Sequence, residues 1–311
     1  MTVARRRLGP DGPLLSQICY GSMRLGVIDE AGRRADHLCQ LHDLGIDTHH
    51  SSHEYDSHSI YLTALGKARA TGRRFRHIVK LADPGFDHDR FDPVRLGRLF
   101  DRSRAELGVD TIDSVQWLFR TPDPNDDLRR IATVTEQAEE VKAWATTQME
   151  NGTLRNLSFF PYSLPFADTI MRQEISATPA TYLNMAERES ITLLDRSHGF
   201  IALRPLAGGR LVGDPVVPDE LVDDRVASVF SSLSPADRAL TALRFPLLHP
   251  SVTTTVVSVN SPGHIDQVME VATTQPDIAA FVDLVDSVVD SGVGSSSDGD
   301  PQDDPIIATE L

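Results

Sequence analysis

The feature that most constrains the fold is an alternation of short apolar runs with longer amphipathic stretches along nearly the whole chain. Eight runs have the length and composition of buried strands. They are LSQICYGSM (15–23), GIDTHHS (45–51), HIVKLA (77–82), IDSVQWLF (112–119), TLRNLSF (153–159), ATYLNM (180–185), GFIALRPL (199–206) and TTTVVSV (253–259). Strands that each lead into a helix predict a parallel α/β fold, and their number favours a closed (β/α)8 barrel.

Several of the intervening stretches carry helix signals. Apolar side chains recur at helical spacing in residues 31–45, and residues 93–108 have the same amphipathic character. Residues 128–152 form a long helical stretch that ends at Gly152, a residue typical of helix C-termini. In residues 234–250 a serine precedes a proline, the order expected at the first two positions of a helix.

The charge of the chain narrows the classes of partner. Its 311 residues carry a formal net charge of −15, which disfavours nucleic-acid phosphates and gives no basic face for anionic lipid. It has no apolar run long enough to span a membrane, and the basic start of the chain lacks the apolar stretch of a signal peptide. Cys19 and Cys39 form no disulfide framework. We expect a cytoplasmic protein with a small-molecule partner; the oligomeric state stays open.

Composition predicts the domain organisation. Residues 1–288 contain no Gly/Ser-rich linker and no change of composition, so we expect one barrel domain there. Residues 289–311 form an acidic, polar tail that holds no basic residue. Such a segment cannot bury enough apolar surface to offset its ordering entropy. We therefore expect a disordered tail that solvates the protein, with regulation as the alternative.

Five segments, taken together and in order, resemble the aldo-keto reductases. They are ICYGSMRLG (18–26), LGIDTHHSSHEYD (44–56), NGTLRNLSFF (151–160), RPLAGGRLVG (204–213) and VVSVNSPGHIDQ (256–267). The resemblance covers about residues 5–288. It implies a (β/α)8 barrel of the aldo-keto reductase type, with its site at the C-terminal mouth of the barrel.

The resemblance implies four catalytic positions, and two of them have changed. The family uses a tyrosine as proton donor, a lysine that lowers the pKa of that tyrosine, an aspartate that holds the lysine, and a histidine that orients the carbonyl. Tyr55 and Lys80 fall on the first two positions. His50 stands at the aspartate position, and Leu118 stands at the histidine position.

The resemblance also implies a nicotinamide site, and this site is more altered. Phe160 and Pro161 replace a Ser-Asn pair that binds the nicotinamide amide, Ala180 replaces a glutamine, and Leu203 replaces a stacking aromatic residue. We therefore expect no cofactor, or only weak binding of NADPH. If NADPH is retained, the residues that remain to bind it are Arg204, Leu206, Gly208, Gly209 and Asn260.

Lys80 and His50 each allow a functional and a structural interpretation. A lysine that faces a barrel interior must be paired or neutral, whereas one at a strand edge can extend to solvent. Histidine in place of aspartate removes the negative charge beside Lys80, so we expect a more neutral lysine. His50 could itself be a base, or it could only fill space and hydrogen-bond locally.

A histidine-rich segment raises the question of a metal. His49, His50, His53 and His58 lie close together in the sequence. Adjacent residues of a strand face opposite sides, so only one of the first two can enter a site. The sequence offers no second group of ligands, and we predict no metal.

Aromatic residues near the ends of two strands suggest the wall of a binding pocket. We expect Trp117, Leu118, Phe160 and Tyr162 to contact the substrate, although the aromatic residues could equally belong to the core. Arg120 could bind an anionic group of the substrate, or it could only pair with Asp123.

These residues predict an enzyme that has left the reductase chemistry. We favour cofactor-independent acid/base catalysis by Tyr55, Lys80 and His50: an isomerisation, dehydration or cyclisation of a small, largely apolar or aromatic metabolite, in biosynthesis or other small-molecule metabolism. One alternative is an NADPH-dependent carbonyl reductase with an altered site. A second is a barrel that binds a small molecule without catalysis. The sequence names neither substrate nor reaction.

Overall fold

The central element of the fold is a parallel sheet of eight strands in the order β7-β6-β5-β4-β3-β10-β9-β8. The computed structural model describes residues 2–24 and 31–289. A bridge between Phe159 and Pro179 joins the two ends of the sheet. The predicted (β/α)8 barrel is therefore confirmed. Its strands are β3 (Ile18–Gly21), β4 (Thr48–Ser51), β5 (Arg76–Ala82), β6 (Ser114–Leu118), β7 (Leu157–Phe159), β8 (Ala180–Tyr182), β9 (Phe200–Leu203) and β10 (Val252–Val257).

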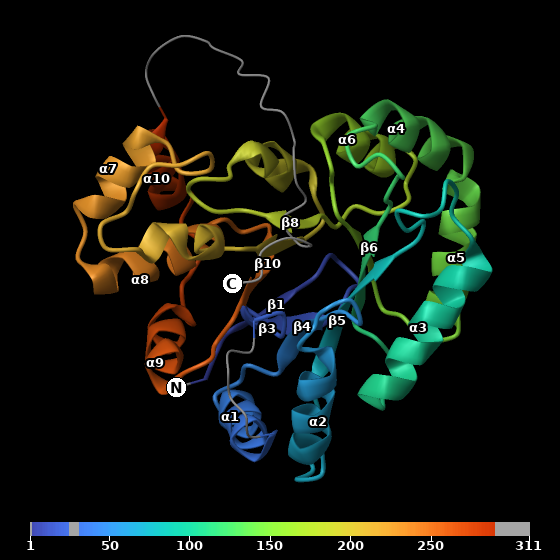
Figure 1. Ribbon diagram of the computed structural model, residues 1–311, viewed down its shortest axis with the longest axis horizontal. Helices are drawn as coiled ribbons and strands as arrows, with labels where there is room; N and C mark the ends of the chain where they lie inside the picture. The colour runs from blue at the N-terminus through green and yellow to red at the C-terminus, as the bar shows by residue number, and fades with distance from the viewer. Residues whose placement is uncertain (1, 25–30, 290–311) are drawn as a thin grey trace.

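Helices surround the strands, as Figure 1 shows. Those of the first half are α1 (Ala31–Asp43), α2 (His58–Arg69), α3 (Pro93–Leu107), α4 (Asp127–Glu136) and α5 (Ala138–Glu150). Those of the second half are α6 (Leu164–Arg172), the 3-10 helices η1 (Glu189–Arg196) and η2 (Ala207–Val212), α7 (Asp224–Ser231), α8 (Pro235–Leu248), α9 (Pro262–Val271) and α10 (Ile278–Val288). Ser234 caps α8 by accepting a hydrogen bond from the Asp237 amide, as its position before a proline predicts.

The helix predicted over residues 128–152 is two helices, α4 and α5, separated at Gln137. The Gln137 side chain accepts a hydrogen bond from the backbone N–H of Phe91 at 2.8 Å and donates one to the Phe91 carbonyl at 3.0 Å. This contact with a loop distant in the sequence fixes the break, and no local helix signal reveals it.

A hairpin closes the N-terminal end of the barrel. Its strands are β1 (Arg5–Arg7) and β2 (Leu14–Ser16), paired antiparallel. Leu8 and Leu15 are fully buried, and they pack against side chains that project from the strands into the barrel. Those side chains belong to Cys19, Ile78, Ala180, Ile201 and Leu203. The strand predicted over residues 15–23 is therefore wrong in extent, because its first residues belong to this hairpin.

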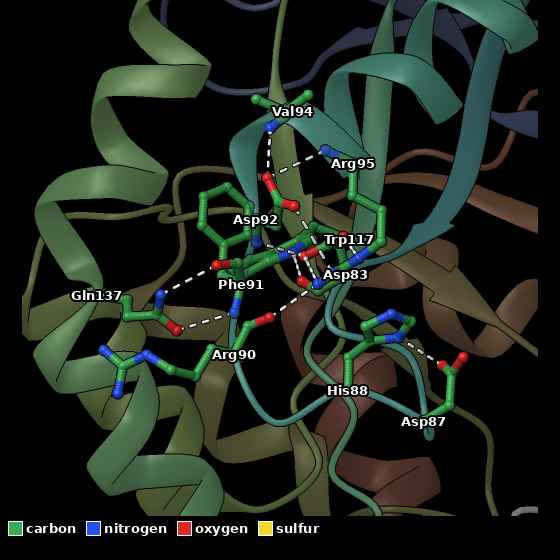
Figure 2. Close-up of polar contacts among 10 residues, drawn as sticks. All are labelled: Asp83, Asp87, His88, Arg90, Phe91, Asp92, Val94, Arg95, Trp117 and Gln137. Atoms are coloured by element: carbon green, nitrogen blue, oxygen red, sulfur yellow. Dashed lines mark hydrogen bonds and ion pairs between the residues drawn. The ribbon is translucent and has the colours of Figure 1, made fainter.

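The loop between β5 and α3 is fastened to the barrel by a buried carboxylate (Figure 2). Asp83, whose side chain is fully buried, accepts hydrogen bonds from the Asp92 amide at 2.8 Å and the Arg95 guanidinium at 3.0 Å. Its backbone carbonyl accepts the indole N–H of Trp117 at 2.7 Å. We call these four residues the Asp83 clasp. The clasp holds the loop against β6, beside the barrel mouth.

Two further sequence predictions concern a membrane-spanning helix and the C-terminal tail. Within residues 2–24 and 31–289, no helix is both long enough and apolar enough to cross a membrane. The tail predicted over 289–311 lies, beyond its first residue, outside the described part of the chain.

Candidate active site

A cavity of about 480 Å³ opens at the C-terminal ends of the strands. Side chains from β4, β5, β6, β9 and β10 reach it, together with the loops that follow β4 and β9. This volume lies in the range of small-molecule pockets, roughly 300–1,000 Å³. The C-terminal face is also where barrels of this kind place their chemistry.

Lys80 lies on β5 and enters this cavity with only 2% of its surface exposed. Its Nζ is 3.1 Å from the Oε2 of Glu54 and 5.3 Å from the centre of the Tyr55 ring. Ser52 joins the loop that carries these two residues to β5, because its hydroxyl donates to the Lys80 carbonyl. The interpretation of Lys80 as a strand-edge lysine that extends to solvent is therefore wrong.

Glu54 supplies the negative charge that His50 cannot. Its carboxylate also accepts two hydrogen bonds from Arg120, at 2.5 and 2.9 Å. Burial would raise the pKa of Glu54, but the Arg120 hydrogen bond and the Lys80 charge outweigh it and lower the pKa to about 2. Glu54 is thus ionised at neutral pH. The expectation that Lys80 has lost its counter-charge is wrong.

Arg120 has a different partner from the one considered in the sequence. Both of its terminal nitrogens bind Glu54, and its guanidinium lies 4.6 Å from the centre of the Phe86 ring. The pairing proposed with Asp123 is replaced by this one. Arg120 therefore binds the carboxylate that faces Lys80. This contact with Glu54 stands in place of the expected contact with an anionic group of the substrate.

His50 faces the cavity from β4, and two hydrogen bonds fix the state of its ring. The amide Nε2 of Gln116 donates to the Ala180 carbonyl at 3.0 Å, so the Oε1 of Gln116 faces His50. That oxygen lies 2.7 Å from the Nε2 of His50. Because an amide oxygen only accepts, these partners assign the proton of the neutral ring to Nε2 and leave Nδ1 as an acceptor.

The ionisation of His50 follows from the same surroundings. Burial lowers its pKa to about 4; the Gln116 hydrogen bond opposes this shift and the Lys80 charge adds to it. His50 is therefore neutral at pH 7. Gln116 was not among the residues expected at the site, and its only sequence signal is a polar residue within an apolar strand.

The other histidines of the segment lie elsewhere. His49 faces away from His50, and its Nδ1 lies 2.9 Å from the Tyr61 hydroxyl, so the opposite orientation of the two neighbours is confirmed. His58 pairs with Glu106 at 3.0 Å. In the part of the chain that the structure describes, no three His, Cys, Asp or Glu side chains are grouped to hold a metal ion.

Aromatic rings form one wall of the cavity. The Phe160 ring centre lies 5.1 Å from that of Tyr162 and 5.5 Å from that of Tyr182, and all three residues line the cavity. Tyr182 was not expected there, although it lies within the strand predicted over residues 180–185; it is the last residue of β8. The wall is suited to a flat apolar ligand.

One residue expected on this wall lies outside it. Gln116 and Leu118 face the cavity from β6, so Trp117 between them points to the opposite side. There its indole belongs to the Asp83 clasp and its ring packs edge-on against Phe91. The prediction that Trp117 contacts a substrate is corrected; that of Leu118 agrees with its place in the lining.

A model of the aldo/keto reductase family matches residues 17–289. This chain belongs to the aldo-keto reductase family. No curated protein matches it in sequence.

Solved structures of other aldo-keto reductases share the fold. The holo form of aldo-keto reductase AKR11C1 from Bacillus halodurans has a TM-score of 0.69 at 17% identity, covering 94% of this chain and 99% of that one. A putative aldo-keto reductase from Pseudomonas aeruginosa has a TM-score of 0.63 at 18% identity, covering 88% and 96%. The thermostable aldo-keto reductase Tm1743, in complex with the inhibitor epalrestat, has a TM-score of 0.63 at 14% identity, covering 91% and 99%.

The loop after β9 keeps the family's glycines and stores backbone strain. Gly208 and Gly209 have φ values of 69° and 104°, and Arg204 and Ala207, which carry side chains, also have positive φ values of 54° and 47°. Positive φ values cost residues with side chains, here Arg204 and Ala207, about 1–3 kcal/mol each, and such residues are concentrated at functional sites. Together with Leu206 this loop borders the cavity. Asn260, expected beside a cofactor, instead bonds the backbone carbonyl of Arg24.

The residues at the nicotinamide positions of this aldo-keto reductase do not fit a nicotinamide. Phe160 and Leu203 line the cavity with apolar side chains, and Pro161 has no backbone N–H to donate. The carboxamide of a nicotinamide would meet no matching polar side chain at these three positions.

Proposed function

We propose that this aldo-keto reductase barrel catalyses non-redox acid/base chemistry on a small, largely apolar or aromatic metabolite, without a nicotinamide cofactor. The reaction class is isomerisation, dehydration or cyclisation. One observation carries the proposal: Tyr55, Lys80 and a carboxylate remain together at the cavity, while apolar and aromatic residues occupy the nicotinamide positions. The free cysteines Cys19 and Cys39 suit the cytoplasm as its location.

Each residue has a role that its surroundings support. Tyr55 is the proton donor in this proposal, because it lines the cavity and its ring centre lies 5.3 Å from the buried Lys80 ammonium group. Lys80 holds a positive charge beside it, and Glu54 fixes that charge in place. His50 receives or relays a proton through Nδ1, since Gln116 engages Nε2. The low pKa of His50 makes it a weak base, suited to substrates whose proton is already acidified by an adjacent carbonyl.

The walls support the substrate class. Leu118, Phe160 and Leu203 give apolar contact, and the edges of Tyr162 and Tyr182 extend the aromatic wall. Ligand pockets commonly combine such apolar walls with a few placed polar groups. The polar groups assigned to catalysis are those of Tyr55, Lys80 and His50, and Arg204, Arg210 and Ser258 add polar side chains elsewhere in the lining.

The test is turnover in D2O without NADPH. Aromatic carbonyl metabolites are incubated with the protein, and deuterium incorporation or a change of structure is followed by mass spectrometry. We expect activity without cofactor, and a loss of about 10²–10⁴-fold in Tyr55→Phe, the scale of a general acid/base group. Lys80→Met should lose activity on the same scale.

Two controls share the chemistry of these changes but lie outside the cavity. Tyr61→Phe removes a hydroxyl that binds His49 on the outer side of the barrel, and Lys67→Met removes an exposed lysine of α2. Both should keep full activity. Turnover that requires NADPH, together with micromolar binding of NADPH in calorimetry, would contradict the proposal and favour a reductase. Tight ligand binding with no turnover would favour the non-catalytic barrel.

A further inference from the structure

The floor of the cavity presents a hydrogen-bond acceptor whose state is fixed before any ligand arrives. Gln116 cannot turn its amide, because its Nε2 donates to the Ala180 carbonyl at 3.0 Å. Its Oε1 therefore takes the proton of His50 Nε2 at 2.7 Å. The neutral ring is left with a lone pair on Nδ1 and no proton there.

Hydrogen-bond donors stand next to this acceptor. The ring centres of His50 and Tyr55 are 6.2 Å apart, and the Lys80 ammonium lies 5.3 Å from the Tyr55 ring centre. An ammonium group only donates, and a tyrosine hydroxyl donates readily. The floor is thus divided into a donor side, made by Tyr55 and Lys80, and an acceptor side, made by His50.

The walls above the floor sharpen this division. Leu118, Phe160 and Leu203 line the cavity with apolar side chains and offer no partner for a polar group of the ligand, whereas the polar side chains of Arg204, Arg210 and Ser258 lie in the segments that follow β9 and β10. A ligand that covers His50 without donating to it would leave a buried acceptor unsatisfied. A site that hydrogen-bonds a particular group of its ligand binds an analogue that lacks this group more weakly.

We propose that His50, as a specificity residue, and Tyr55 together select a ligand that carries a hydroxyl group on the carbon next to a carbonyl, attached to an aryl or similar apolar body. The carbonyl oxygen accepts from Tyr55, and the hydroxyl donates to Nδ1 of His50. The inference rests on the proposed function only in using the same cavity, because the preference is a property of binding and does not require turnover.

The test compares two ketones by calorimetry. The probe 2-hydroxy-1-phenylethanone has the carbonyl, the aryl ring and the donor, and 2-methoxy-1-phenylethanone has a methyl group in place of the donor hydrogen. We expect the native protein to bind the hydroxy ketone about fivefold more tightly, the value of one net hydrogen bond of about 1 kcal/mol. His50→Phe should abolish this preference, and Tyr55→Phe should weaken both ketones alike. His53→Phe changes a histidine in the loop that carries Tyr55 but outside the cavity lining, and it should preserve the preference.

A second measurement addresses the ring itself. Long-range ¹H–¹⁵N NMR spectra report which nitrogen of His50 is protonated, and we expect the Nε2–H tautomer in the native protein. Gln116→Met should release this bias and reduce the preference between the ketones. An Nδ1–H tautomer, equal affinities for the two ketones, or no binding of either would overturn the inference. A preference with no turnover of any substrate would uphold the inference and contradict the proposed function alone.

Discussion

At the scale of single residues, the negative charge that pairs with Lys80 comes from a different sequence position than in the family. The family's aspartate is carried by a strand, whereas Glu54 lies in the loop directly before Tyr55. The counter-charge of Lys80 and Tyr55, the proposed proton donor, are therefore held by the same short segment. Arg120 fixes that segment from the end of β6. Movement of the loop would displace both groups together.

Glu54→Gln should destabilise the protein and slow the reaction. The substitution leaves two nearly buried cations, Lys80 and Arg120, without their carboxylate. Losing one partner of a buried ion pair costs about 3–5 kcal/mol, and the 27% exposure of the Glu54 side chain reduces this to about 2 kcal/mol. Denaturant unfolding measures the loss. Glu106→Gln, similarly exposed but outside the cavity, should cost clearly less; equal losses would contradict this account.

Stability should fall as the pH is lowered from about 6.5. Burial lowers the pKa of His50 to about 4 and that of His77 to about 3, whereas an unfolded histidine titrates near 6.5. Between these values the unfolded chain binds protons that the folded protein does not, so stability is complete above pH 6.5 and declines toward pH 4. Below about pH 4.5 the lowered pKa of Glu54 adds to the decline.

Denaturant unfolding between pH 7.5 and 4.5 checks this dependence. His77→Phe removes one of these contributions, and its stability should change less with pH than that of the native protein. His88, which is partly exposed and pairs with Asp87 in a loop, gives the matched substitution His88→Phe, in which the decline caused by His50 and His77 should persist. A flat native profile from pH 7 to 5 would contradict the assignment.

At the scale of strands, helices and loops, the Asp83 clasp fastens the β5–α3 loop beside the cavity. Asp83→Ala should destabilise the protein by about 3 kcal/mol, because Arg95 loses its carboxylate and the Asp92 amide loses its acceptor. Asp87→Ala, on an exposed carboxylate of the same loop, should change stability by less than about 0.5 kcal/mol. Thermal and denaturant unfolding would measure both. Similar stability for the two variants would show that the clasp contributes little.

The spacing of apolar residues and the composition of the strand segments made most of the barrel predictable. The apolar run 77–82 coincides closely with β5, and the alternation of side chains along β4 correctly separated His49 from His50. The same alternation along β6 places Trp117 and Leu118 on opposite sides, so the prediction that both contact the substrate is wrong for Trp117. Contacts between distant segments were out of reach. Glu54 pairs with Arg120 across 66 positions, and no local pattern encodes such a distance.

At the scale of the whole molecule, we expect limited proteolysis to leave one resistant core. Within the described residues, one buried apolar cluster has members from Val3 to Val288, and the two ends of the sheet are joined. Proteases should therefore remove residues beyond about 288 and spare the rest, as mass spectrometry of the fragments would show. A chain ending at residue 288 should unfold like the full-length protein. Cleavage into two stable halves would contradict the single domain.

The hairpin that closes the N-terminal end has a consequence for the order of events in catalysis. Within the described residues, Leu8 and Leu15 fill the barrel below the cavity, so the mouth at the C-terminal end serves both entry and exit. In the proposed reaction, the product must leave through the same opening by which the next substrate enters, so the two cannot occupy it together. Inhibition by product should therefore be competitive with substrate, and slow departure of a tightly bound aromatic product would set the pace of the cycle.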